Sequence, residues 1–154
     1  MKHIILINKK CVLTFLLCSL LTVGLLTPPT FGGELSSKEI LEMVEEQSFR
    51  ASLMAVEAKA TDDYYMAQQA FALATEAAGW VAEVSEIAHR MSNAELGRTA
   101  HDAASKIRVV IIHVQIAARQ ISDTNLDPEI IHAANFLVNS CELALRQFGG
   151  PAPR

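Results

Sequence analysis

Two Glu-x-x-His motifs stand out in this sequence, because glutamate and histidine side chains can bind metal ions. They pair Glu86 with His89 and Glu129 with His132. On a helix, a spacing of three places both side chains on one face. Carboxylates can bridge hard iron ions, and an imidazole can complete the coordination of each ion. The two motifs are therefore the first candidates for a metal site.

The paired motifs resemble the ferritin-like di-iron pattern, in which two helices each supply a Glu-x-x-His and two others each supply a Glu. On a helical wheel, however, Glu86 lies about 180° from the core residue Ala77, and His132 lies about 140° from Leu137. The helix predicted between them has no central glutamate, because Glu95 falls in its first turn. We predict solvated surface side chains here, with no metal ligand and no cofactor. A metal- or cofactor-binding bundle is the alternative.

The other reactive side chains indicate no catalytic site either. His101 and His113 lie about 120° apart on one predicted helix, so they cannot share a metal. Cys141 falls on an apolar stripe without a neighbouring base and is predicted to be a small buried hydrophobe. The sequence has no serine-nucleophile, glycine-rich phosphate-binding or zinc-protease signature. We predict a protein that is not an enzyme; an enzyme whose site assembles only in an oligomer is a third hypothesis.

The first 32 residues are typical of an export signal. Lys2, Lys9 and Lys10 precede sixteen uncharged residues, 11–26, and two prolines follow. That run is short for a spanning helix, which needs about 20 apolar residues. We predict cleavage after Gly32 and a periplasmic or secreted protein, with an uncleaved anchor as the alternative. A lipoprotein site at Cys18 is disfavoured, because a leucine precedes it.

The charge of the remaining chain argues against two classes of partner. Residues 1–32 carry three lysines and no acid, so the net charge changes from −4 for the whole chain to −7 for the rest. An acidic domain with scattered Arg and Lys is a poor ligand for nucleic acid or anionic lipid. We predict no nucleic-acid partner and no membrane insertion beyond the signal segment.

Helix-capping residues divide the rest of the chain into four predicted helices. Capping boxes begin at Ser36 and Ser92, Thr61 precedes two acids, and Asp127 precedes a proline. The predicted helices cover 37–60, 63–91, 94–121 and 128–148, although 37–91 could also be one long helix. Short connections make neighbours antiparallel, so we predict an all-α, four-helix up-down-up-down bundle. The domain is predicted to cover 33–150, with a free tail at 151–154.

Apolar residues at helical spacing define one predicted core stripe on each helix. The stripes in chain order are Ile40, Val44, Ala51 and Ala55; Met66, Ala70, Leu73, Ala77, Val81, Val84, Ala88 and Met91; Leu96, Ala100, Ile107, Ile111, Val114 and Ile121; and Ile130, Ala133, Ala134, Leu137, Cys141, Ala144 and Phe148.

Two further apolar stripes lie roughly opposite these core stripes. One consists of Phe49, Leu53 and Val56, and the other of Val109, Ile112 and Ile116. An exposed stripe of large apolar side chains usually indicates a partner. We predict a binding or assembly protein that uses these six residues to contact another protein or itself. A rotated core, or a third helix buried on all sides, would explain the stripes equally well.

Overall fold

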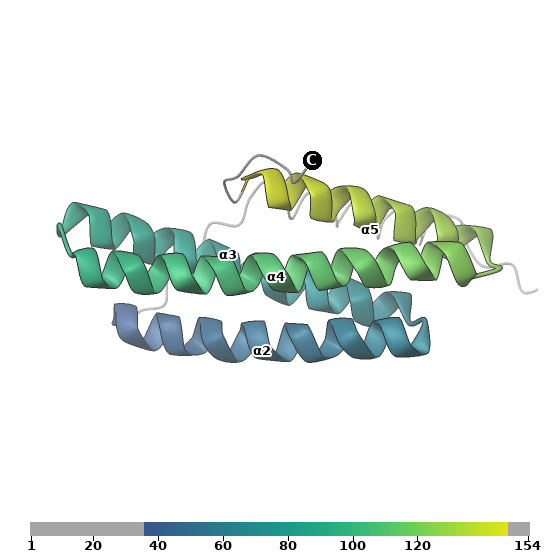
Figure 1. Ribbon diagram of the computed structural model, residues 1–154, viewed down its shortest axis with the longest axis horizontal. Coiled ribbons are helices and arrows are strands. Elements are labelled where there is room, and N and C mark those ends of the chain that lie inside the picture. Colours follow the sequence, from purple (N-terminus) through teal and green to yellow (C-terminus); the bar gives the residue numbers. More distant parts are fainter. Residues whose placement is uncertain (1–35, 148–154) are drawn as a thin grey trace, which may run out of the picture. The chain divides into compact units, whose positions relative to one another are not determined.

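The computed structural model describes residues 36–147, which form four α-helices and no strand (Figure 1). The helices are α2 (Ser37–Thr61), α3 (Tyr64–Arg90), α4 (Ala94–Thr124) and α5 (Pro128–Gln147). The prediction of an all-helical domain with four helices is confirmed, and the predicted boundaries agree within three residues. The signal segment, Phe148 and the tail lie outside the described residues.

Local side chains explain where the helices begin and break. The Ser36 hydroxyl accepts a hydrogen bond from the Glu39 amide, and the Glu39 carboxylate accepts one from the Ser36 amide, which completes a capping box. Asp62 adopts a left-handed backbone with φ of 53°, and the Asp63 carboxylate caps the next helix by accepting from the Met66 amide. The chain therefore breaks between α2 and α3 instead of continuing as one helix.

Helix α4 lies at the centre of the bundle. It packs against α2, α3 and α5, whereas no Cα atom of α2 comes within 8 Å of one in α5 (Figure 1). The Lys106 ammonium donates to the Glu45 carboxylate over 2.7 Å, and the Gln120 amide donates to the Lys59 carbonyl over 2.8 Å. Both contacts join residues 61 apart in the sequence, so α2 and α4 run parallel, and a residue of α2 is level with the residue 61 positions later.

The core consists mainly of alanine. Alanine is the most frequent buried residue, and the largest side chains that are fully buried come mostly from α4: Ile107, Ile111, Ile121, Val44, Val84, Val114 and Cys141. Such small side chains let helix axes approach closely. The predicted core stripe of α2 is buried throughout. Met91 was wrongly placed in the core: it follows the last residue of α3 and is exposed, because the chain turns there toward α4.

Candidate functional site

The two Glu-x-x-His motifs do not come together. Glu86, His89, Glu129 and His132 are all exposed. The first motif ends α3 and the second begins α5. Since α4 runs between these points, about 40 Å of helix separates them. Within residues 36–147, no three His, Cys, Asp or Glu side chains lie close enough together to hold a metal ion.

Cys141 is buried in the core of α5, as its stripe predicted. Burial raises the pKa of its thiol to about 12, and the neighbouring Glu142 carboxylate adds to that shift. A thiol with this pKa stays protonated near neutral pH, and the thiolate is the nucleophilic form. Cys141 therefore acts as a small apolar side chain here.

The two histidines of α4 lie in different surroundings. His101 is exposed, whereas His113 is half-buried and its Nδ1 atom has no hydrogen-bond partner. They lie three turns apart along the helix, so they form no common site.

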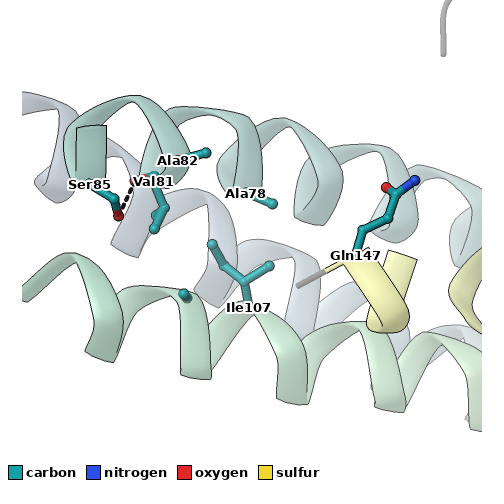
Figure 2. A pocket seen from close by; sticks show the side chains of 7 residues that line it. Ala78, Val81, Ala82, Ser85, Ile107 and Gln147 are labelled. Atoms are coloured by element: carbon teal, nitrogen blue, oxygen red, sulfur yellow. Dashed lines mark hydrogen bonds between the residues drawn. The ribbon is translucent and has the colours of Figure 1, made fainter. Parts of the chain in front are cut away.

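A small cavity at the end of α5 offers little chemistry. It has a volume of about 310 Å³ and lies between α3 and α4, with apolar side chains such as Val81 and Ile107 along its walls (Figure 2). Ser85 and Gln147 are its only polar lining residues among those described. The Ser85 hydroxyl already donates to the Val81 carbonyl over 2.8 Å, so it is not poised as a nucleophile.

A larger groove of about 690 Å³ runs between α2 and α4. Phe49 from α2 and Val109 from α4 both line it, so the groove contains one residue from each of the two predicted outward stripes. Its remaining lining is acidic at the start of α2, basic at one residue of α4 and otherwise small or apolar, and comprises Glu42, Glu45, Glu46, Ser48, Ser52, Lys106 and Val110. This groove is one end of a broader surface, here named the α2–α4 face, formed by Phe49, Leu53, Val56, Val109, Ile112 and Ile116.

The side chains of the α2–α4 face are mostly open to solvent. The exposed fractions on α2 are 66% for Phe49, 55% for Leu53 and 58% for Val56. On α4, Val109 is 50% and Ile116 is 44% exposed, while Ile112 between them is half-buried.

The parallel alignment of α2 and α4 brings the two stripes to the same height. With the offset of 61 residues, Leu53 is level with residue 114, which is midway between Ile112 and Ile116. The stripe on α2 and the stripe on α4, which lie far apart in the sequence, therefore form one continuous surface. On α4 this surface is the side that α2, α3 and α5 leave uncovered.

Charged groups border this face at the start of α2. The Lys106 ammonium holds the pKa of Glu45 below its ordinary value, and Glu45 raises the pKa of Lys106 in return. Both side chains are well exposed, so solvent screens the pair and it adds little to stability. The pair places one negative and one positive charge in the lining of the groove.

Two features of the surface were missed by sequence reasoning. Glu42 and Glu46 continue the spacing of Phe49 and Leu53 toward the start of α2, and this periodicity could have shown that the outward stripe has an acidic end. A separate exposed pair, Phe136 and Leu143, lies two turns apart on α5. That pair has no counterpart on a neighbouring helix.

Comparisons with known proteins add no assignment: no family model matches the chain, and neither a curated protein nor a solved structure matches it. None of the helices within residues 36–147 is both long enough and apolar enough to cross a membrane. The geometry of the α2–α4 face is therefore the basis for a functional conclusion.

Proposed function

We propose that this chain is an exported, non-enzymatic assembly protein whose α2–α4 face packs against another protein surface. The single observation that carries the proposal is the alignment of two exposed apolar stripes on neighbouring parallel helices. Scattered apolar residues are normal on protein surfaces, but contiguous patches mark interaction sites.

The energetics favour coverage of this face. Full burial of a large apolar side chain stabilises a protein by about 1.5–3 kcal/mol relative to exposure. Five of the six residues of the face leave 44–66% of their surface in water. An interface that covered them would gain several kcal/mol before the entropic cost of association.

A photocrosslinking residue placed at Leu53 tests the proposal in the producing cell. We expect a covalent adduct, with the linked peptide identified by mass spectrometry, from position 53 and not from the matched control position Phe136, which is exposed on α5. Equal adducts from both positions, or none from position 53, would contradict the proposed function.

Export has its own test, because it depends on residues 1–32 alone. Mass spectrometry of the mature protein should find an N-terminus near Gly33. An intact Met1 on a membrane-bound product would overturn the cleaved-signal part of the proposal.

A further inference from the structure

We propose that the protein packed on the α2–α4 face is a second copy of this chain, antiparallel to the first about a two-fold axis beside Leu53. This inference rests on the proposed function and adds the identity of the partner and the geometry of the pairing. Its basis is that the apolar residues, the charges and the level of α4 all share one centre.

The apolar residues of α2 are symmetric about that centre. Phe49 lies four residues before Leu53, and Val56 lies three residues after it. In an antiparallel pairing about Leu53, Phe49 of one copy therefore faces Val56 of the second copy. Large side chains meet large side chains at both ends, and the two Leu53 side chains meet at the axis.

The charges beside this stripe are self-complementary. On one flank, next to α4, Glu45 lies eight residues before Leu53 and Lys59 lies six residues after it. On the other flank, Arg50 and Glu57 lie three residues before and four residues after. A two-fold axis that crosses the helices at right angles reverses their direction but keeps each flank on its own side. It therefore places Glu45 opposite Lys59 and Arg50 opposite Glu57.

A two-fold axis along the helices would instead keep their direction and exchange the two flanks. It would pair the α2 stripes in parallel, but the α4 helices of the two copies would then lie on opposite sides of the α2 pair. Ile112 and Ile116 would meet no counterpart on the second copy. The apolar residues of α4 therefore select the antiparallel arrangement.

Helix α4 fits the same axis independently. The α4 stripe, which runs from Val109 to Ile116, is centred between residues 112 and 113, about 2 Å along the helix from residue 114, and residue 114 is level with Leu53. The axis that pairs the α2 stripes therefore also brings Ile112 of one copy opposite Ile116 of the second copy. Residues from two helices meet their own counterparts about one centre.

The size of the face predicts a dimer of modest affinity. From Glu45 to Lys59 the face is about 21 Å long, and two packed helices are about 20 Å wide. This is near the lower limit of specific interfaces, so association should be reversible in the micromolar range.

Three variants of the full chain, each with one added cysteine, test the pairing: Phe49→Cys, Leu53→Cys and Val56→Cys. Mild oxidation should join two copies of Leu53→Cys, because the two positions face each other at the axis. Two copies of position 49 would lie about 12 Å apart along the helices and two copies of position 56 about 9 Å, beyond the reach of a disulfide. A mixture of Phe49→Cys and Val56→Cys should crosslink between the two variants.

The unsubstituted chain and Phe136→Cys serve as controls for the native cysteines and for random collision, and the linked peptides are identified by mass spectrometry. Homodimer crosslinks at all three positions would overturn the antiparallel arrangement. No crosslink at Leu53 would overturn pairing with a second copy. If photocrosslinking at position 53 then captured a different, identified protein, the proposed function would stand while this inference failed.

Discussion

Replacement of Phe49 by alanine separates the contribution of the α2–α4 face from that of the fold. In one copy, 66% of the Phe49 side chain is exposed, so an interface can bury about two thirds of the 1.5–3 kcal/mol that full burial provides. That amounts to about 1–2 kcal/mol for each copy and about 2–4 kcal/mol for a symmetric pair. We expect Phe49→Ala to weaken dimerisation by roughly 30-fold to 1000-fold.

Sedimentation equilibrium over a range of concentrations measures this change in Kd, and urea unfolding at low concentration measures the stability of the single chain. Because little of Phe49 is buried within one copy, the free energy of unfolding should change by no more than about 1 kcal/mol.

Phe136→Ala is the matched control: Phe136 is 52% exposed on α5, outside the proposed interface, and should leave the Kd unchanged. Equal weakening by both substitutions, or unfolding of Phe49→Ala, would refute the reasoning.

Four further outcomes follow from the core and from assembly. Ala74→Leu overfills the closely packed interior of α3 and should lower the free energy of unfolding by about 1–3 kcal/mol in urea titrations, whereas Ala72→Leu on the exposed side of the same helix should change it by about 0.5 kcal/mol or less. Cys141 should not react with thiol reagents at pH 8 until the protein is unfolded. Mass spectrometry of the peptide that contains Cys141 measures the extent of modification. The pKa of the Cys141 thiol is about 12 in the folded chain and 9.0 as the ordinary value, so the folded chain keeps this proton to a higher pH than the unfolded chain does. The free energy of unfolding of the wild type should therefore fall as the pH rises above about 9, and it should fall more steeply than that of Cys141→Ala. Finally, the Tm should rise with protein concentration in wild type and less so in Phe49→Ala, because association stabilises only the folded chain.

The helices were predictable because the residues that cap them act locally. Ser36, Asp63 and Asn93 each accept a hydrogen bond from a backbone amide in the first turn of a helix, and such caps depend only on residues close in the sequence. Two of the predicted caps were one or two residues early, because Asp63 and not Thr61 caps α3, and Asn93 and not Ser92 caps α4. The choice between one long first helix and two helices could not be made from periodicity. It depends on the left-handed backbone at Asp62, and an aspartate in a sequence does not by itself indicate that conformation.

The identity of the core was predictable only in part. A single stripe for each helix missed Val110, Ala117 and Ala118, which are buried because α4 contacts three other helices. The number of neighbours of a helix is a tertiary property, and a helical wheel does not contain it. For the same reason, the joint α2–α4 face could not be derived: its two stripes were visible, but their common height depends on the register between parallel helices, which the contacts of Lys106 and Gln120 reveal.

The distribution of side-chain sizes around α2 supports a function for its outward stripe. After Ile40 and Val44 its buried side chains are all small, namely Ser48, Ala51, Ala55 and Ala58, whereas the larger Phe49 and Leu53 face away from the core. Rotation of α2 would bury more apolar surface but would also take the charges beside the stripe out of water, at a cost that unpaired ions cannot recover. The flanking charges thus keep the larger apolar side chains on the solvent-exposed side of α2. Large apolar side chains are ordinarily buried, and regular departures from that preference are expected at functional sites.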